Sequence, residues 1–526
     1  MKKVISAIFI LFTGITLALL LFRAGKVEYY LKREFLTGNI PLLLYILLFS
    51  FTIILLMMRF GKGAERFLEK YSAFLLPVAL LLLFAGELVF VRAFFFYQDW
   101  DPLAVLSAVY HTLHGETAEI SVGYFSAHPN NLALVALYLG ILKLAGILGS
   151  ESVLIIAGAQ CLLITLSAFL LFRILRAEGC SYLCAWGAFL IYALWIGFSP
   201  WIVCTYSDMT GLVFPVLVLR LFQLLSGGRL REGVSYALWC LLGLLGALGY
   251  AIKPQTVIVL ISVVFIYIFR SFRERGGWKW LPVFCLSFIL AHVLLSAGLS
   301  KVLPVELDSS RNFSAVHYFM MGLNDETDGV YSKDDTEYTS SFDDPKERKK
   351  ADLELAKKRM ADFGLKGLAS HLEKKQLVDF GDGTFSWGID GNFFAGKEIE
   401  GLPSVKETRF TPFLESWLFT EGQHYPLYST IRQSMWLIIL FFCLLAGVFL
   451  SGASDTMISA ALSIVGLTVF ELLFEAKARY LLICTPVFLL LAVFGIQGFC
   501  RALSPELRST RHFRRNTPHK GSRRGQ

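Results

Sequence analysis

Charged residues are scarce in this sequence of 526 residues. They make up 17% of the chain, whereas soluble proteins carry about 25%. This shortage excludes a disordered chain, a coiled coil and a set of soluble domains. Hydrophobic residues reach 55% and gather in runs of about 20, the length at which a helix crosses ~30 Å of hydrocarbon. We therefore expect an all-α polytopic membrane protein.

Cysteine is absent from the long polar stretch at 301–430, although the chain holds nine cysteines. A disulfide-stapled exterior domain is therefore not expected. Cys180 and Cys184 form a C-x₃-C pair, but no second pair of cysteines or histidines accompanies them. We expect buried thiols there and no metal site.

Twelve segments have the length and hydropathy of membrane spans. The first begins with MKK, but no A-x-A cleavage site follows it, so we interpret it as an uncleaved span. The expected spans are 4–22, 41–58, 73–95, 152–172, 183–199, 208–226, 234–250, 253–270, 280–298, 432–451, 456–474 and 479–499.

Lysine and arginine in short loops predict the orientation of these spans. Lys2 and Lys3 place the N-terminus in the cytoplasm, and the basic loop after the second span is cytoplasmic too. The chain ends in a basic tail at 501–526, which is typical of the cytoplasmic face and of contact with anionic lipid rather than nucleic acid. The protein is thus expected in the cell membrane, with both termini cytoplasmic and the loop at 299–431 extracytoplasmic.

Residues 131–149 are apolar enough to cross the membrane, but a crossing there would place Arg173 and Arg176 outside. We favour a helix lying along or dipping into the outer leaflet, which leaves twelve spans. The alternative has thirteen spans and one exception to the charge rule.

Five regions follow from this topology. They are an N-terminal hairpin (1–60), a transmembrane module (61–298) that includes the exterior loop 96–150, a large exterior loop domain (299–431), a C-terminal three-helix segment (432–500) and the tail (501–526), which we expect to be disordered. Within the large loop, Leu353, Met360, Phe363, Leu368 and Leu372 recur at roughly helical spacing and predict an exposed helix over 345–377.

Asp99 and Asp101 stand on either side of Trp100, directly after the third span. Isolated, such a pair is usually solvated, but an Asp close to hydrocarbon is costly unless it has a partner or a function. A second polar group, with Tyr124, His128, Asn130 and Asn131, opens the ambiguous apolar helix. Helix capping would explain Asn130, and hydrogen bonding at the interface would explain His128.

Further polar residues lie at the expected exterior ends of spans. Snorkelling explains any single cation among them, but together they suit a lipid-linked phosphate, whose head group lies at that depth. They are Asp208, Lys253, Glu475, Arg479 and Tyr480. His317 and Asn324 belong to an apolar, amide-bearing motif in the large loop. This motif either folds back on the site or packs inside the exterior domain.

The arrangement resembles the conserved module of the C-type glycosyltransferases (GT-C). In both, a span leads to an exterior loop that opens with an acidic motif, then to six spans and a large exterior loop. The segments that carry the likeness are 99–101, 124–131, 317–324 and 475–480, and the module covers 73–431. It is similar to protein O-mannosyltransferases and to bacterial aminoarabinose and related lipid-linked sugar transferases. No W-W-D-type motif follows the last spans, so the resemblance does not extend to oligosaccharyltransferases.

The resemblance implies helices parallel to the membrane in the first exterior loop and an inverting glycosyltransferase. The donor would be a polyprenyl-phosphate-linked sugar, and the acceptor a cell-envelope glycan, lipid or protein outside the membrane. We expect Asp101, ahead of Asp99, as general base, with Arg479 and then Lys253 stabilising the leaving phosphate. No cofactor is required, although the Asp pair is compatible with a divalent metal.

Two other functions fit the same composition. A transporter or flippase of lipid-linked saccharides would place charges near mid-membrane in paired, broken helices. We find no internal repeat and no inverted halves. A surface-polymer polymerase or ligase would share the polyprenyl carrier but use a pyrophosphate-linked glycan.

Overall fold

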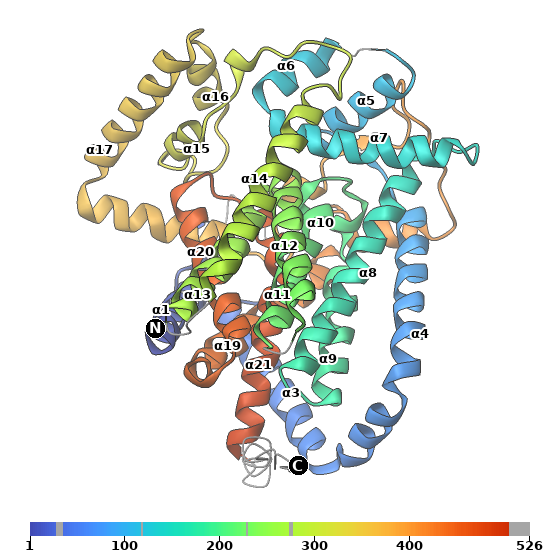
Figure 1. The fold of residues 1–526 in the computed structure, drawn as a ribbon, viewed down its shortest axis with the longest axis vertical. Helices are drawn as coiled ribbons and strands as arrows, with labels where there is room; N and C mark the ends of the chain where they lie inside the picture. Colours follow the sequence, from blue (N-terminus) through green and yellow to red (C-terminus); the bar gives the residue numbers. More distant parts are fainter. Residues whose placement is uncertain (28–34, 117–118, 228–229, 273–276, 504–526) are drawn as a thin grey trace, which may run out of the picture.

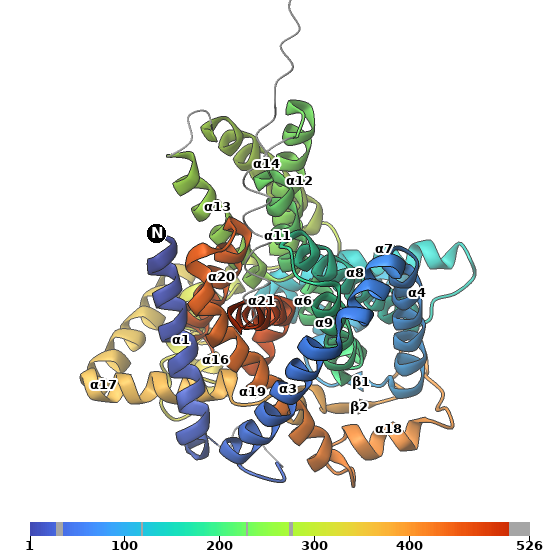
Figure 2. The same cartoon turned by 90° about the horizontal axis from the view of Figure 1, so that it is seen from below.

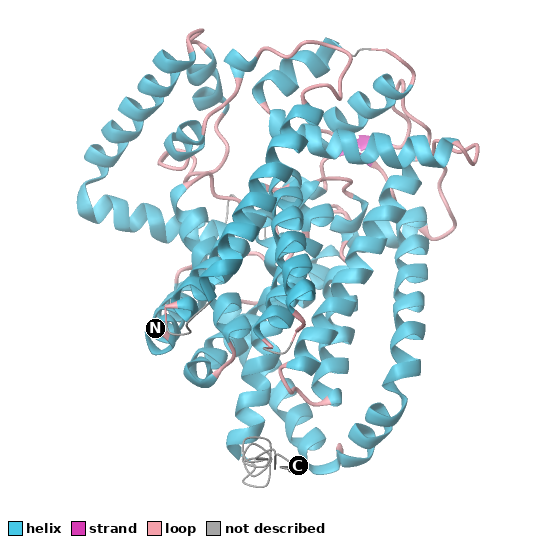
Figure 3. Cartoon of the chain, viewed as in Figure 1, coloured by secondary structure: helices cyan, strands magenta, loops and turns pink. Residues whose placement is uncertain are grey.

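Helices make up almost all of the regular structure, and one short pair of strands completes it (Figure 3). The computed structural model describes residues 1–27, 35–116, 119–227, 230–272 and 277–503. Most of the predicted basic tail therefore lies outside the described residues. Figure 1 shows the long helices running together as a bundle, with shorter helices across one end and a lobe at the side.

The helices and strands have the following bounds: α1 (Lys2–Phe22), α3 (Asn39–Phe60), α4 (Lys62–Phe94), β1 (Tyr97–Gln98), α5 (Asp101–Leu113), α6 (Glu119–Ala127), α7 (Leu132–Gly146), α8 (Val153–Ala177), α9 (Tyr182–Tyr192), α10 (Ser207–Gly211), α11 (Val213–Ser226), α12 (Glu232–Ile252), α13 (Val257–Ser271), α14 (Trp280–Leu299), α15 (Ala315–Met321), α16 (Lys333–Ser340), α17 (Pro345–Phe380), β2 (Phe394–Gly396), α18 (Thr411–Leu418), α19 (Tyr425–Phe449), α20 (Asp455–Leu473) and α21 (Thr485–Leu503). Short 3₁₀ or π turns that matter below are η2 (Pro129–Asn131), η3 (Ala193–Gly197), η4 (Pro200–Val203), η8 (Trp387–Gly391) and η10 (Ala478–Cys484).

Twelve helices in the described part of the chain are long and apolar enough to cross a membrane. This confirms the predicted all-α polytopic fold. Every predicted span but one lies in such a helix. The exception is 183–199, where the apolar helix Tyr182–Gly197 is shorter than the twelve. It ends before Pro200, and a residue that precedes proline is disfavoured in helical conformation.

The segment Pro129–Gly146 completes the set of twelve, because its length and composition would allow it to cross a membrane. It consists of η2 and α7, and Figure 1 shows α7 lying across the ends of α4 and α8 rather than alongside them. Helices α5 and α6 lie at the same end of the bundle (Figure 1). This is the arrangement expected of a helix that follows a membrane surface.

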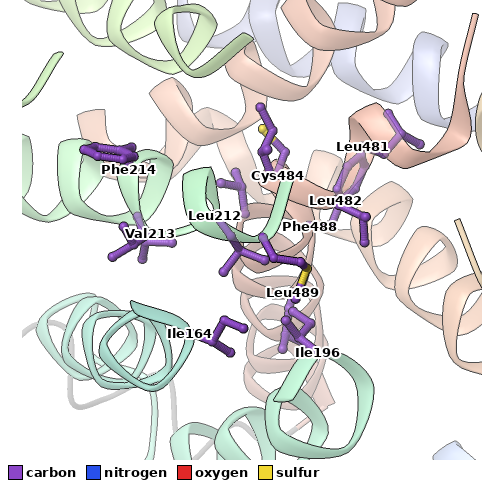
Figure 4. Packing of buried hydrophobic residues seen from close by; sticks show 14 of the residues in the cluster. Ile164, Ile196, Leu212, Val213, Phe214, Leu481, Leu482, Cys484, Phe488 and Leu489 are labelled. Carbon is purple, nitrogen blue, oxygen red and sulfur yellow. The ribbon is translucent and has the colours of Figure 1, made fainter. Parts of the chain in front are cut away.

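The middle of the bundle is formed by α21, which Figure 2 shows surrounded by other helices. Around it, apolar side chains from α8, α11 and η10 interlock without exposure to solvent (Figure 4). Leu212, Phe488 and Cys484 have exposed fractions of 0%. Burial of such side chains contributes roughly 1.5–3 kcal/mol each, so this core holds the ends of the polar segments described below in fixed positions.

Helices α15, α16 and α17 form a lobe that stands outside the helix bundle and is named the exterior lobe for that reason (Figure 1). The predicted helix at 345–377 is present as α17, but it kinks at Gly364, whose φ of 56° favours glycine. Leu353 and Met360 are exposed, as expected of an exposed helix. Beyond the kink the helix turns onto α1, where Gln376 donates a hydrogen bond to Thr16 (Nε2–Oγ1 2.7 Å). Its last turns are therefore buried.

Candidate functional site

Asp101 is held at the first turn of α5, just after the short strand β1. Strand β1 pairs antiparallel with β2, so that Tyr97 faces Gly396. This pairing ties the loop after α4 to the segment after α17. Pro102 at the start of α5 fixes the backbone, as proline does in a first helical turn. Asp101 is half-buried as a result.

The two carboxylates of the acidic motif differ in their surroundings. Asp99 is exposed, and its backbone N–H donates to the carbonyl of Phe393 at 3.0 Å. Asp101 accepts a hydrogen bond from the Tyr206 hydroxyl at 2.9 Å. No cation forms an ion pair with Asp101 among the residues that the structure describes. Asp101 is thus the carboxylate that belongs to the internal polar network.

That network continues to the segment that opens α7. The Tyr206 hydroxyl also lies 3.1 Å from Asn131 Oδ1, and Asn131 Nδ2 donates to the Tyr124 hydroxyl at 2.6 Å. Burial, followed by the negative charge of Asp101, raises the pKa of Tyr124. Asn131 therefore joins two tyrosines that both face Asp101.

Asn130 and His128 lie at the edge of this network. Asn130 is exposed, and no side chain caps the start of α7, so capping does not account for it. His128 packs against Tyr124 with ring centroids 5.0 Å apart. Its Nδ1 is 3.4 Å from the hydroxyl of Tyr318 in the exterior lobe. Burial lowers the pKa of His128, and the nearby Asp101 opposes this shift.

Three predicted residues from distant parts of the chain meet in a buried ionic cluster. Lys253 Nζ lies 2.5 Å from Asp208 Oδ1, and Arg479 Nη1 lies 3.2 Å from Asp208 Oδ2. Their exposed fractions are 5%, 1% and 7% for Lys253, Asp208 and Arg479. Snorkelling to water therefore does not describe these cations. Gly211 allows the approach, because a Cβ there would lie 3.2 Å from the Cβ of Lys253.

A second carboxylate, Asp390 in η8, extends this cluster. Its Oδ1 is 3.2 Å from Lys477 Nζ, and its Oδ2 is 3.7 Å from Arg479 Nε. The Nε of Arg479 has no hydrogen-bond acceptor among the described residues. We use the name cation cluster for Lys253, Lys477 and Arg479 with their partners Asp208 and Asp390. Buried charges of this kind are tolerated only when paired.

Aromatic rings connect the cation cluster to Asp101. The guanidinium carbon of Arg479 lies 4.3 Å from the ring centre of Trp100, the neighbour of Asp101. Trp100 and Tyr206 meet edge to face at 5.2 Å. The ring of Tyr480 covers Lys253 Nζ at 4.8 Å, and its hydroxyl donates to Glu475 at 3.2 Å. The rings shield the cations from water, which strengthens their attraction to an anion.

His317 and Asn324 make their hydrogen bonds inside the exterior lobe. His317 Nδ1 lies 2.7 Å from Thr339 Oγ1, and Asn324 Nδ2 donates to Asp335 Oδ2 at 3.0 Å. Packing within the exterior domain, the alternative considered for this motif, is therefore what the structure shows. The ring of Phe313 lies between His317 and His128 and forms, beside the Tyr318 contact, a second link from the lobe to the site.

Tyr206, Asp390 and Lys477 were not predicted as site residues. Tyr206 precedes Asp208 by two positions and Lys477 lies in the 475–480 segment, so both stand beside residues that were predicted. Around Asp390 the sequence shows only a glycine-rich turn, which does not indicate a site. No group of three or more His, Cys, Asp or Glu residues suited to a metal ion occurs in the described part of the chain.

The chain was compared with protein families, curated proteins and solved structures. No curated protein and no solved structure matches this chain. Residues 1–499 match a protein family described as "Conserved hypothetical integral membrane protein". This match covers most of the chain and agrees with its twelve long apolar helices. The chain therefore belongs to the family of conserved hypothetical integral membrane proteins.

Proposed function

We propose that this protein is a membrane glycosyltransferase that moves a sugar from a polyprenyl-phosphate donor to an acceptor outside the membrane. The observation that carries the proposal is that a carboxylate lies close to a cluster of cations. Asp101 is a carboxylate without an ion-pair partner in the described structure. It stands beside a cluster with two buried cations, Lys253 and Arg479, and the rings of Trp100 and Tyr206 contact both Asp101's segment and Arg479. A base and an anion-binding group are the two things that such a transfer requires.

Asp101 is the proposed general base. Its hydrogen bonds come from neutral side chains, so its carboxylate remains free to accept a proton from an acceptor hydroxyl. Asp99 is exposed and lacks these contacts. The Tyr124 and Tyr206 hydroxyls hold Asp101 in one orientation, as a positioned base requires.

The cation cluster is the proposed site for the donor phosphate. Arg479 and Lys253 share Asp208. The Nε of Arg479 is 3.7 Å from Asp390 but has no hydrogen-bond acceptor among the described residues, which leaves capacity for another acceptor. A monophosphate leaving group is already a weak base, so it needs charge stabilisation more than protonation. Such stabilisation is strongest where water is excluded.

The proposed step balances as follows. The acceptor oxygen forms a bond to the anomeric carbon while its proton passes to Asp101. The bond between the anomeric carbon and the phosphate oxygen breaks, and the phosphate leaves with the electron pair beside Arg479. Attack opposite to the leaving group inverts the anomeric centre. The proton on Asp101 then returns to solvent.

The proposal is tested with purified protein in lipid nanodiscs and a polyprenyl-phosphate sugar. The expected result is release of polyprenyl phosphate that depends on an added hydroxyl acceptor. A flippase would instead move the intact donor between the leaflets of sealed vesicles and release no phosphate. That outcome would favour the transporter considered above over the glycosyltransferase.

A separate experiment, the comparison of cell-envelope sugars with and without the gene, would identify the sugar.

A further inference from the structure

A second group of buried charges lies next to the cation cluster, where the end of α17 meets the end of α20. Lys375 and Asp379 are one turn apart on α17, and Glu471 stands in the last turn of α20. All three have an exposed fraction of 0%, and neighbouring Glu475 has 8%. These residues have no part in the proposed transfer step.

The hydrogen bonding of this group is incomplete. Lys375 Nζ donates to the carbonyls of Gly322 (3.0 Å) and Phe474 rather than to a carboxylate. Neither oxygen of Asp379 and neither oxygen of Glu471 has a hydrogen-bond donor in good geometry among the described residues. An ionised carboxylate in this situation loses hydration that its remaining contacts replace only in part, which costs several kcal/mol. A bound proton removes that cost.

The balance of charges also favours a bound proton on one of these carboxylates. Across the two adjoining groups, four cations face five carboxylates, so the carboxylates are in excess even without a ligand. The cations are Lys253, Lys375, Lys477 and Arg479, and the carboxylates are Asp208, Asp379, Asp390, Glu471 and Glu475. A bound alkyl phosphate adds one or two further negative charges.

We propose that Asp379 and Glu471 form a proton-binding site that takes up a proton when an anionic phosphate binds the cation cluster. The inference rests on the proposed function, because it takes the cation cluster as the site of the donor phosphate. Proton uptake keeps the buried region close to neutral while the donor is bound. When the phosphate leaves, the proton leaves as well.

The groups around Asp379 place this titration near neutral pH. Burial raises the pKa of Asp379 to about 7, although Lys375 and the backbone amide of Lys477 favour its ionised form and Glu475 opposes it. Burial lowers the pKa of Lys375 to about 8, against the charges of Asp379, Glu471 and Glu475. Glu471 faces these same groups and Lys253. An incoming anion favours the protonated carboxylates, so uptake should be largest just above pH 7.

The test is calorimetric titration of the full chain in nanodiscs with farnesyl phosphate, a short polyprenyl monophosphate. Runs at pH 7.5 in buffers of low and high ionisation enthalpy give the number of protons exchanged. We expect net uptake by the wild type and little or none by Asp379→Asn combined with Glu471→Gln. Glu373→Gln on the same helix, whose carboxylate pairs with Arg23 and Lys26, is the matched control. It should behave as wild type.

If only the cation cluster responded to the phosphate, binding would release protons instead of taking them up. The second pKa of an alkyl phosphate is about 6, and nearby cations favour the dianion, so binding without the carboxylate pair releases protons. Equal proton exchange in wild type and double variant, or net release by the wild type at pH 7.5, would overturn the inference and leave the proposed function intact. Absence of binding by the wild type would overturn both. If the double variant does not fold, the wild type is measured at pH 6, where the carboxylates already carry their proton and uptake should be smaller. Proton uptake at pH 6 as large as at pH 7.5 would overturn the inference.

Discussion

Tyr206 donates its phenolic hydrogen to Asp101 across 2.9 Å, and it does so from a position two residues before Asp208. The short segment that leads into α10 therefore carries a contact to the proposed base and the central carboxylate of the cation cluster. Motion of this segment would disturb both at once. This relationship makes Tyr206 the residue that sets the spacing between the two halves of the site.

Replacing Tyr206 with phenylalanine should lower turnover about tenfold with little loss of donor affinity. The hydroxyl contributes a hydrogen bond to a charged group, worth roughly 1.5–3 kcal/mol, while the ring that packs on Trp100 remains. Initial rates and donor binding are measured on the same preparation. Tyr236→Phe, on a partly exposed ring of α12, is the control and should retain full activity. Unchanged turnover in Tyr206→Phe would remove this contact from the mechanism.

The helices could be predicted because apolar runs of the right length are a local property of the sequence. The kink of α17 could not. Gly364 stands in an otherwise helical pattern, and the turn there becomes favourable only when the later residues pack on α1 and α20. The orientation of α7 depended in the same way on its neighbours, since its composition alone is compatible with a membrane span.

The site was predictable where charges stood next to hydrophobic spans. Asp208, Lys253 and Arg479 were each identified at a span end, but their sequence positions do not reveal that one carboxylate binds both cations. Asp390 and the Lys375–Asp379 pair lie in polar sequence, where charges are ordinary. The packing of α17 and η8 against the bundle buries Lys375 and Asp379 and partly buries Asp390. For His317 and Asn324 the sequence left two alternatives open, and their hydrogen bonds lie within the lobe.

Arg479→Ala should weaken donor binding by at least tenfold, because the phosphate loses a charge-assisted partner worth roughly 1.5–3 kcal/mol. Arg479→Lys should recover part of the affinity, since the charge remains but the planar fork is lost. Equilibrium binding of farnesyl phosphate provides the measurement. Arg92→Ala is the control, because Arg92 is exposed and donates only to the carbonyl of Lys406 in the described structure. An affinity of Arg479→Ala equal to that of wild type would contradict the proposed phosphate site.

Asp208→Asn should destabilise the fold by about 3–5 kcal/mol, the usual effect of removing one partner from a buried ion pair. Lys253 then loses its carboxylate, whereas Arg479 keeps its contact with Asp390. Adding Lys253→Met should restore part of the stability, because the unpaired charge is removed. Thermal unfolding in detergent tests both variants. An unfolding midpoint of Asp208→Asn equal to that of wild type would contradict the buried pairing.

Acid should destabilise the exterior lobe through His317. Burial lowers the pKa of His317 to about 4 from an ordinary 6.5, so the fold favours the neutral ring. Its stabilising contribution is complete above pH 6.5 and is lost as the pH falls from 6.5 toward 4, by about 2 kcal/mol at pH 5. Proteolysis of the lobe at pH 7 and pH 5 is the measurement. His317→Gln should reduce the difference, and an undiminished difference would assign it to other groups.

The orientation of the chain can be tested by labelling introduced cysteines in intact cells. Ser340→Cys in the exterior lobe and Ala64→Cys in the first turn of α4 are both at exposed positions. A membrane-impermeant maleimide should label the first and not the second, because the basic loops indicate a cytoplasmic position for Ala64. Both substitutions are made in a variant whose nine native cysteines have been replaced, so that no other cysteine can be labelled. The reverse pattern would place the site on the cytoplasmic side.

The most direct measurement is the rate of polyprenyl phosphate release by Asp101→Asn, with donor binding determined in parallel. General-base catalysis contributes about 10²–10⁴-fold, and the amide keeps the size of the side chain but cannot take the acceptor's proton. We predict that turnover falls by that factor while donor affinity stays within about twofold of wild type, and that Asp99→Asn stays close to wild type in both. Near-native release by Asp101→Asn would contradict the role of this carboxylate, and near-native release by Asp99→Asn combined with Asp101→Asn would exclude the acidic motif from the chemistry.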